Sequence, residues 1–321
     1  MTPLITELIA VEPAGPGEFV SKVLPIRLGN AMPIAYGGCS IAAAVNAAYQ
    51  TVPANVSLYS LVGHYLGPAS TEQKLYCTVH QTRNTRSFAT RRVEVKQKAK
   101  DGKFRACLEL IADFHVREPS SIEYMAAPVT TYAPPDDCPD LKVRVADLLS
   151  RGLVTEKQRA SFEASLGPMG ELFETRYCVN SISGQNLSGV AKNISTSQDN
   201  RAATDKTSAE WQRCREILKT PAEQMAALAF LMDGALAFVP LTHNHLWFED
   251  VEACSSLDFA LRIFTPDIDV NQWTLRERVA LRSGSGRSYA EGRLWDTQGN
   301  LLASMTQQSI IRLKANAKAN L

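Results

Sequence analysis

A short pattern of residues occurs twice in this chain, and the two copies lie roughly 200 residues apart. Residues 86–93 (RSFATRRV) are matched by residues 287–294 (RSYAEGRL). Upstream, residues 66–68 (LGP) are matched by 264–266 (FTP), and the segment beginning Val45-Asn46 is matched by the one beginning Met232-Asp233. Segments that recur in one order over this distance predict a duplicated domain rather than a solenoid.

Each copy contains the same sequence of expected elements. The alanine-rich residues 40–49 predict a helix that ends before Pro53, and its apolar character on nearly every side predicts burial. Extended segments are expected at about 57–66, 74–98 (broken near 83–85) and 103–116, and the second copy repeats the scheme with a helix at 225–239 and strands at about 254–264, 272–282, 287–296 and 301–313. Antiparallel strands can bury such a helix only if their sheet curls around it. We therefore expect an α+β fold of two units, each a sheet wrapped around a helix.

The sequence between the two copies has a different character. The expected parts are an N-terminal unit at 1–117, a proline-rich linker with short helices at 118–170, a C-terminal unit at 171–314 and a polar tail at 315–321. Further strands are expected near 172–177 and 208–217. Residues 180–206 are rich in Ser, Asn, Thr and Gly and show no periodicity, which predicts a mobile surface insertion.

Composition restricts the classes of partner and cofactor. A net charge of +1 gives no electrostatic reason to expect nucleic acid or a membrane surface, and we find no apolar run of about 18 residues that would predict a membrane span. Seven cysteines without a CxxC pair predict free thiols, and the start of the chain lacks the basic region of a secretory signal. His243-Asn244-His245 could place two imidazoles on one strand face, but without a third ligand we expect no metal.

Several motifs together resemble one known family. Residues 36–39 (YGGC), 86–93, 229–233 (AFLMD), 255–258 (SSLD) and 302–307 (LASMTQ) resemble those of the double-hotdog acyl-CoA thioesterase II family. The resemblance covers about residues 20–117 and 208–313. It implies a double hotdog fold, hydrolysis of an acyl-CoA or another acyl thioester without a metal or redox cofactor, and assembly into homodimers or homotetramers.

The resemblance also implies a catalytic trio in the second copy, formed by Asp233, Ser256 and Gln307. The approximate counterparts of these residues in the first copy are Asn46, Leu58 and Leu110, so the polar chemistry occurs once. Polar groups at positions that face a buried helix cost stability unless they bond to each other or to a ligand. We expect Asp233 to have a raised pKa and to deprotonate water, although direct attack to form an anhydride and a purely structural capping role remain open.

Other residues are weaker candidates for substrate binding. Backbone N–H groups of Gly38 and Cys39, at the start of the first helix, could form an oxyanion hole. Coenzyme A phosphates could bind Arg83, Arg86, Arg91 and Arg287, for which solvated positions or hairpin salt bridges are equally plausible. A packing role is favoured for His64, which is shifted by two residues from the place where family members often have a histidine. Asp258 alternates away from Ser256, which favours a surface role.

Two other functions remain possible from the sequence. One is a hotdog dehydratase, hydratase or cyclase in which Asp233 abstracts a carbon-bound proton, and the other is a non-catalytic acyl-binding protein. The final residues Ala319-Asn320-Leu321 resemble a peroxisomal targeting tripeptide. We expect a peroxisomal or a cytoplasmic location.

Overall fold

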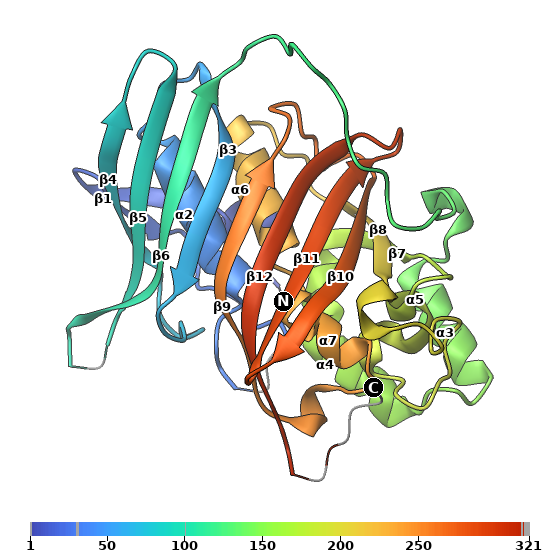
Figure 1. Cartoon of the computed structure of the whole chain (residues 1–321). Helices are drawn as coiled ribbons and strands as arrows, with labels where there is room; N and C mark the ends of the chain where they lie inside the picture. Colours follow the sequence, from blue (N-terminus) through green and yellow to red (C-terminus); the bar gives the residue numbers. More distant parts are fainter. Residues whose placement is uncertain (1, 30–31, 100, 316, 318–321) are drawn as a thin grey trace. The chain divides into compact units, whose positions relative to one another are not determined.

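The computed structural model describes residues 2–29, 32–99, 101–315 and 317 of the 321-residue chain (Figure 1). The fold divides into two compact units whose segments alternate along the sequence. Unit 1 comprises Met1–Met125, Glu216–Gly234 and Leu257–Asn271, and unit 2 comprises Ala126–Arg215, Ala235–Ser256 and Gln272–Leu321. The tripeptide 319–321, on which the targeting prediction depends, lies outside the described residues.

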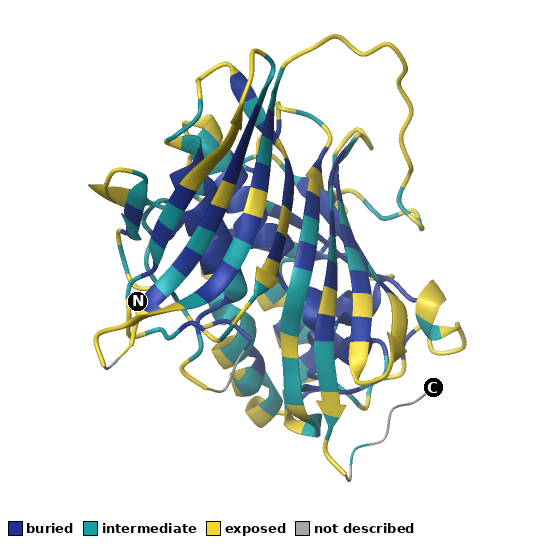
Figure 2. Cartoon of the chain, turned by 60° about the vertical axis from the view of Figure 1, so that its left-hand side comes forward, coloured by how far each residue is buried: buried dark blue, intermediate teal, exposed yellow. Residues whose placement is uncertain are grey.

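Unit 1 contains an antiparallel sheet in the order β1-β2-β4-β5-β6-β3-β9. Its elements are α1 (Ile5–Leu8), β1 (Val11–Gly15), β2 (Glu18–Ser21), α2 (Gly37–Tyr49), β3 (Val56–Tyr65), β4 (Tyr76–Asn84), β5 (Phe88–Lys98), β6 (Phe104–Val116), α6 (Pro221–Met232) and the second half of β9 (Val251–Ile263). Figure 2 shows buried and exposed residues alternating along its strands, as expected for a sheet with one face on a core.

Helices α2 and α6 form the core of unit 1. Residues 41–45 of α2 and 226–232 of α6 are fully buried, which explains why neither sequence has a polar face. Helix α6 starts with a capping box between Thr220 and Glu223 and has Pro221 in its first turn, two strong start signals. The side chain of Tyr36, just before α2, packs edge-on against Phe230 of α6 with ring centroids 4.9 Å apart. The two helices therefore lie in direct contact.

Unit 2 contains antiparallel strands in the order β12-β11-β10-β8-β7. Its main elements are α3 (Leu141–Ser150), α4 (Glu156–Leu172), β7 (Phe173–Tyr177), α5 (Ile182–Asn186), β8 (Ser208–Cys214), α7 (Val239–Thr242), the first half of β9, β10 (Thr274–Gly284), β11 (Arg287–Asp296) and β12 (Leu301–Leu313). A two-residue turn of Ser285 and Gly286, both at positive φ, joins β10 to β11, as in a tight hairpin.

The expectation of an exposed insertion at 180–206 is wrong. Much of this segment is buried, including Ser181, Asn186 and Leu187, which have no exposed surface. The Ser181 hydroxyl accepts a hydrogen bond from the Gly184 N–H, and the Asn186 carboxamide accepts one from the Gly189 N–H. Short polar side chains that bond to nearby backbone hold the segment together, and this kind of order leaves no hydrophobic periodicity in a sequence.

The expectation that no segment is long and apolar enough to cross a membrane is also corrected. By length and composition, the stretch Pro221–Thr242 passes that test, but 89% of the apolar window is buried inside the protein. A fully buried core helix has this composition for the same physical reason as a membrane helix. The stretch is also interrupted, because α6 ends at Met232 and Ala235 adopts a left-handed conformation with φ of 66°.

Candidate active site

Asp233 occupies the position that ends helix α6. Its backbone is still helical, with φ of −64° and ψ of −21°, and its N–H donates to the Ala229 carbonyl at 3.4 Å. The residue is only 6% exposed. A carboxylate here lies at the negative end of the helix dipole and out of bulk water, which is an unfavourable place unless other groups bind it.

Tyr65 supplies such a group. Its hydroxyl donates a hydrogen bond to Asp233 Oδ1 at 2.8 Å, although the two residues are separated by 168 positions in the sequence. Tyr65 is the last residue of β3, and its ring packs against Phe259 with centroids 5.7 Å apart. Burial first, and then the negative charge of Asp233, raise the pKa of Tyr65 well above its usual value. The phenol therefore stays protonated and acts as a donor.

The N-terminus of α2 approaches the same carboxylate. A Cβ atom at Gly37 would lie 2.6 Å from the Tyr65 hydroxyl oxygen and 2.9 Å from Asp233 Oδ2. At Gly38, a Cβ atom would lie 2.8 Å from the carbonyl oxygen of Phe230. Only glycine fits at these two positions, so the glycine pair allows the start of α2 to sit against the end of α6. First-turn N–H groups lack partners within a helix and favour negative charge.

Cys39 is not a nucleophile at neutral pH. It is buried, and burial is the main reason that its pKa is raised to about 12. Its backbone N–H, an expected oxyanion donor, donates to the Tyr36 carbonyl oxygen at 3.0 Å. Of the two predicted donors, Gly38 is therefore the better candidate.

The other two members of the predicted trio belong to unit 2. Ser256 is half-buried on β9, directly before the residue at which unit 1 resumes. Gln307 is 1% exposed on β12 and pairs with Ala290 of β11. Because Asp233 belongs to unit 1, the trio as one assembly stays a prediction.

The counterparts in the first copy have no comparable chemistry. Asn46 is half-buried on α2, and its carboxamide oxygen accepts a hydrogen bond from Gln50 Nε2 at 3.3 Å, one turn along the helix. Leu58 and Leu110 are each 1% exposed and belong to the apolar core. The first copy thus has an ordinary core where the second has a carboxylate, a hydroxyl and an amide.

The prediction that Arg91 binds coenzyme A phosphates is wrong. Arg91 is 1% exposed, and burial lowers its pKa. All of its N–H groups are directed to protein acceptors: Thr51 Oγ1 and O, Arg83 O, Asn84 Oδ1 and Thr90 O, at 2.7–3.1 Å. A guanidinium group with five such bonds stabilises the β4–β5 hairpin and has no donor left for a ligand.

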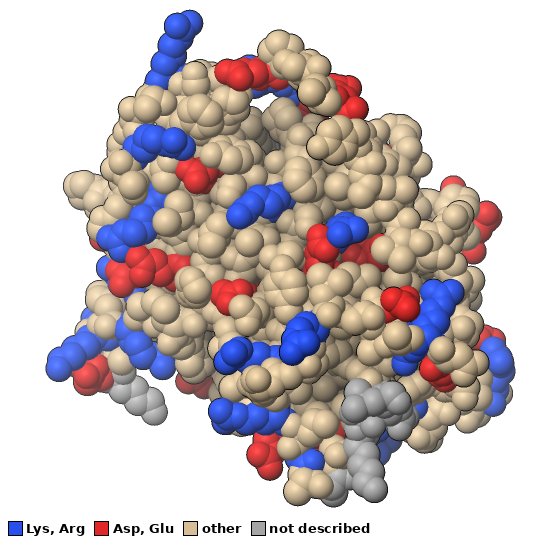
Figure 3. All heavy atoms as spheres, viewed as in Figure 1, with Lys and Arg blue, Asp and Glu red and all other residues tan. Residues whose placement is uncertain are grey.

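The other predicted phosphate ligands are accessible. Arg86 lies in the turn between β4 and β5, and Arg287 begins β11, and both are exposed. Arg83 is bound to Asp113 at 3.2 Å. Figure 3 shows basic and acidic side chains intermingled on the face in view. Arg86 and Arg287 therefore remain candidates for phosphate binding, but the structure adds nothing in favour of either.

His64 lies on the opposite side of its strand from the candidate site. It is exposed and stands opposite Glu109 and Asp258 in the sheet, whereas its neighbour Tyr65 reaches Asp233. The expected packing role is therefore wrong, because successive side chains of a strand point to opposite faces. Buried Leu61 and Gly63 alternate with exposed Val62 and His64 along the strand. The sequence does not show this alternation, because an apolar valine occupies the exposed position 62.

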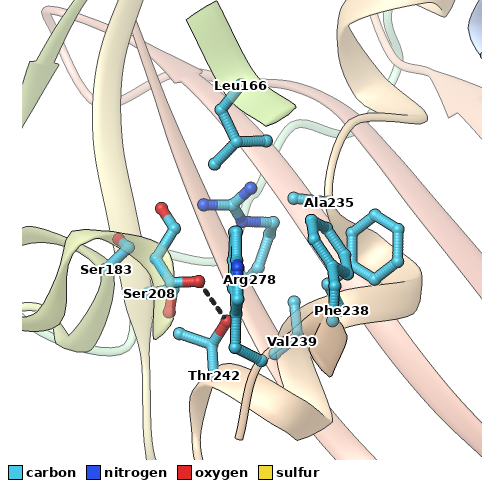
Figure 4. A pocket seen from close by; sticks show the side chains of 11 residues that line it. Leu166, Ser183, Ser208, Ala235, Phe238, Val239, Thr242 and Arg278 are labelled. Carbon is cyan, nitrogen blue, oxygen red and sulfur yellow. Dashed lines mark hydrogen bonds between the residues drawn. The ribbon is translucent and has the colours of Figure 1, made fainter. Parts of the chain in front are cut away.

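Unit 2 contains a separate small pocket, shown in Figure 4. Hydroxyl groups of Ser183, Ser208 and Thr242 and the guanidinium group of Arg278 line one part of it, and Phe238 contributes to an apolar wall. Arg278 also belongs to a buried ion cluster, in which the Glu210 carboxylate binds Arg276 at 2.7 Å and Arg278 at 2.5 Å. These contacts describe a well-bonded interior rather than an open binding site.

The two histidines expected on one strand face lie instead in the turn that follows α7. His243 Nε2 is 3.1 Å from Ser208 Oγ, and burial, with Arg278 and Lys206 nearby, lowers the His243 pKa from 6.5 to about 3. His245 contacts Asp199 at 2.9 Å. Among the residues that the structure describes, no group of three His, Cys, Asp or Glu side chains could hold a metal ion.

Comparison with known proteins gives the family. Residues 13–115 match the acyl-CoA thioesterase N-terminal domain, and residues 167–311 match the acyl-CoA thioesterase C-terminal domain. The chain belongs to the acyl-CoA thioesterase family. The predicted family and the assignment as a thioester hydrolase are thereby confirmed. In this thioesterase, residues 116–166, which contain most of the predicted linker, fall between the two matched domains.

Named relatives and solved structures agree with the family. This thioesterase is 23% identical to human acyl-coenzyme A thioesterase 8 over 282 residues, which cover 87% of this chain and 81% of the relative. The rat protein of the same name is equally similar, with 80% of it covered. The acyl-CoA thioesterase II TesB2 from Mycobacterium marinum has a TM-score of 0.69 at 19% identity, covering 98% of this chain and 100% of that one. A hot dog fold protein from Alicyclobacillus acidocaldarius also scores 0.69, at 18% identity, with 97% and 98% covered. The predicted hotdog fold is confirmed.

Proposed function

We propose that this thioesterase hydrolyses acyl-CoA with Asp233 as the general base. The observation that carries the proposal is the surroundings of this carboxylate: it is buried, it accepts a hydrogen bond from Tyr65, and it lies close to Gly37 at the start of α2. A buried carboxylate beside helical N–H groups brings a proton acceptor and oxyanion donors together.

The proposed reaction proceeds in two steps. Asp233 accepts a proton from a water molecule while the water oxygen attacks the thioester carbonyl carbon, and the carbonyl electron pair moves onto oxygen. N–H groups in the first turn of α2, that of Gly38 foremost, stabilise this oxyanion. When the carbonyl reforms, the C–S bond breaks, and the coenzyme A sulfur leaves with the proton that Asp233 accepted. The products are a carboxylic acid and the free thiol.

Ser256 and Gln307 are proposed to orient the attacking water. Their side chains offer a hydroxyl and a carboxamide, which can accept and donate hydrogen bonds at neutral pH without changing charge. Gln307 supports this role by its burial, since it follows the apolar buried positions Ala303 and Met305 on the same strand. Ser256→Ala and Gln307→Leu should each lower kcat by roughly ten- to a thousandfold if they act on the water.

A thiol-release assay over acyl-CoA substrates of several chain lengths tests the role of Asp233. Asp233→Asn should lower kcat by roughly 10²–10⁴-fold, the usual contribution of a general base. Asp258→Asn is the matched control, because Asp258 is a half-buried aspartate on β9 that stands opposite exposed His64. Equal loss in both variants, or full activity in Asp233→Asn, would refute the assignment. Binding of acyl-CoA without thiol release from the wild type would favour an acyl-binding protein or a hotdog dehydratase, hydratase or cyclase.

Single-turnover hydrolysis in ¹⁸O-labelled water distinguishes general-base attack from an anhydride. With enzyme in excess, general-base attack places one ¹⁸O atom in the carboxylic acid in the first turnover. If Asp233 were the nucleophile, label would enter the Asp233 carboxyl group when the anhydride is hydrolysed there, and the acid would carry an unlabelled oxygen from the protein. The tryptic peptide containing Asp233 can be weighed in the same experiment.

We also propose a homodimer or homotetramer and a peroxisomal location. Sheets with exposed edges favour assembly, and the C-terminal Ala319-Asn320-Leu321 supports peroxisomal import. Light scattering of the purified protein tests the first proposal. Microscopy of the full chain with a fluorescent protein fused to its N-terminus tests the second, with Leu321→Asp as the control; cytoplasmic fluorescence of the unmodified chain would refute it.

A further inference from the structure

The site contains a second side chain whose position is explained by the proposed reaction. Tyr65 comes from the first copy of the repeat, whereas Asp233 comes from the second, yet the phenol donates directly to Asp233 Oδ1 at 2.8 Å. The strand places this hydroxyl rigidly, because the Tyr65 ring is held against Phe259. A rigid donor fixes both the position of the carboxylate and its rotation.

The two carboxylate oxygens of Asp233 therefore have different surroundings. Oδ1 accepts the hydrogen bond from Tyr65, whereas Oδ2 lies close to Gly37 at the start of α2. The absence of a side chain at Gly37 keeps the space beside Oδ2 clear, because a Cβ atom would lie 2.9 Å from that oxygen.

We infer that Tyr65 is a positioning residue for the proposed reaction: its hydrogen bond to Oδ1 holds the Asp233 carboxylate in the orientation in which it accepts the proton from water. The inference rests on the proposed general-base role of Asp233. Without Tyr65, the carboxylate loses this hydrogen bond, and fewer molecules would have the productive geometry. The acceptor would then be poorly aligned, and misplacement of a reacting group by about 1 Å can cost on the order of a hundredfold in rate.

The titratable groups near Tyr65 allow a change in the pH dependence of the rate to be attributed to Asp233. Within unit 1, the other titratable groups that interact electrostatically with Tyr65 besides Asp233 are Tyr36 and Cys39. Burial raises the pKa of Cys39 to about 12, and the Tyr36 hydroxyl donates to the Phe230 carbonyl oxygen at 2.6 Å, so both are neutral donors at working pH. A change in the acid limb of the rate profile when Tyr65 is altered reports on the carboxylate.

Tyr65→Phe, compared with Tyr49→Phe, provides the experiment. Tyr49 is matched because it is also half-buried in unit 1 and its hydroxyl oxygen accepts a hydrogen bond from the Leu58 N–H at 3.1 Å, but it lies at the far end of α2. Tyr65→Phe should lower kcat by roughly ten- to a hundredfold and change KM by less than about twofold. It should also move the acid limb of kcat/KM to higher pH, because a lost donor makes the carboxylate easier to protonate.

A fluorinated tyrosine at position 65 keeps the test valid if Tyr65→Phe does not fold. A difluorinated phenol fills nearly the same space and is a stronger hydrogen-bond donor, so it should move the acid limb to lower pH, opposite to phenylalanine. If both variants at position 65 leave the acid limb where Tyr49→Phe leaves it, the inference is overturned. Absence of thiol release by the wild type, or retention of thiol release in Asp233→Asn, would instead reject the proposed function. Failure of the inference about Tyr65 and failure of the proposed function therefore give different results.

Discussion

The close approach of α2 to Asp233 makes Gly37→Ala a quantitative test of the site. The added methyl group would lie 2.6 Å from the Tyr65 hydroxyl oxygen and 2.9 Å from Asp233 Oδ2, distances that no carbon atom tolerates. Alanine is intrinsically better than glycine in a helix by up to about 1 kcal/mol, but a forced shift in a packed interior costs about 1–3 kcal/mol. The clash is therefore the larger effect, and we expect a net loss of up to about 2 kcal/mol of unfolding free energy after the helix preference is subtracted.

Gly170→Ala is the control for this substitution. Gly170 lies in the last turn of α4, and a Cβ atom there would touch only Leu141 Cδ2 at an ordinary 3.7 Å. Without a clash, only the helix preference remains, so Gly170→Ala should stabilise the protein by roughly 0.5–1 kcal/mol. Urea unfolding monitored by circular dichroism measures both variants. The close approach of Gly37 to Tyr65 and Asp233 would be refuted if Gly37→Ala stabilised the protein as Gly170→Ala does.

The same substitution should also disturb catalysis. Relief of the clash requires the phenol or the carboxylate to move, which breaks or lengthens their 2.8 Å hydrogen bond. We expect kcat to fall by at least roughly tenfold, while Gly170→Ala leaves it within about twofold. A Gly37→Ala enzyme with normal kcat would show that the alignment of Asp233 does not depend on this approach.

Three further predictions concern buried charges. Glu210→Gln should destabilise the protein by about 3–5 kcal/mol in urea, because it removes the carboxylate that binds two buried arginines, whereas Glu163→Gln, in an exposed pair with Arg159, should cost less than about 1 kcal/mol. The pKa of His243 is lowered from 6.5 to about 3, so the unfolded chain takes up the proton first as pH falls, and native stability declines below pH 6.5. His243→Gln should remove about 2 kcal/mol of the stability difference between pH 6.5 and pH 5, and an unchanged difference would contradict the burial. Arg91→Lys should lower stability by about 2 kcal/mol without raising the KM for acyl-CoA, and a raised KM at unchanged stability would restore Arg91 as a phosphate ligand.

The repeated architecture was predictable because the same pattern of segments occurs twice in the sequence. Strands β11 and β12 occupy the expected ranges 287–296 and 301–313, and α2 is the expected buried helix with three more residues at its start. Strong alternation and an alanine-rich apolar run are local signals that depend on little beyond their own segment. The confirmed fold follows from these signals together with the family resemblance.

Two features, the buried segment 180–206 and the fully bonded Arg91, could not be predicted from the sequence for physical reasons. The segment 180–206 is held by side-chain hydrogen bonds to nearby backbone, such as Asn186 to Gly189, which have no period. Arg91 was predicted to bind phosphate because arginine side chains are usually exposed. Its five hydrogen-bond acceptors, however, come from the β4–β5 hairpin and from Thr51, a residue 40 positions away. Hydrogen-bond partners set by tertiary structure cannot be read from spacing.

Tyr65 was missed for a related reason. The resemblance directed attention to a histidine on β3, and His64 was the histidine available there. The face of a strand, however, depends on register, and a shift of one residue exchanges every inward and outward side chain. In this register, position 65 faces Asp233 and position 64 faces solvent.

The contributions of the two copies to the site are complementary, and this explains why one carboxylate is enough. The first copy provides Gly37 and Tyr65, and the second provides Asp233. By the same correspondence of segments, a reciprocal site would use Asn46 with Gln224 and Ile263, which offer neither a carboxylate nor a phenol nor a glycine approach. Each copy therefore provides residues that the corresponding positions of the other copy do not provide.

The reciprocal position gives a final prediction. Asn46 already bonds to Gln50 on its own helix, so Asn46→Ala should leave thiol release within about twofold of wild type. Asn46→Asp placed in the Asp233→Asn background should not restore hydrolysis, because Gln224 and Ile263 supply neither the space nor the phenolic donor that Gly37 and Tyr65 supply to Asp233. Recovery of activity in that double variant would mean that a carboxylate alone makes the site, and that the positioning argued from Tyr65 is unnecessary.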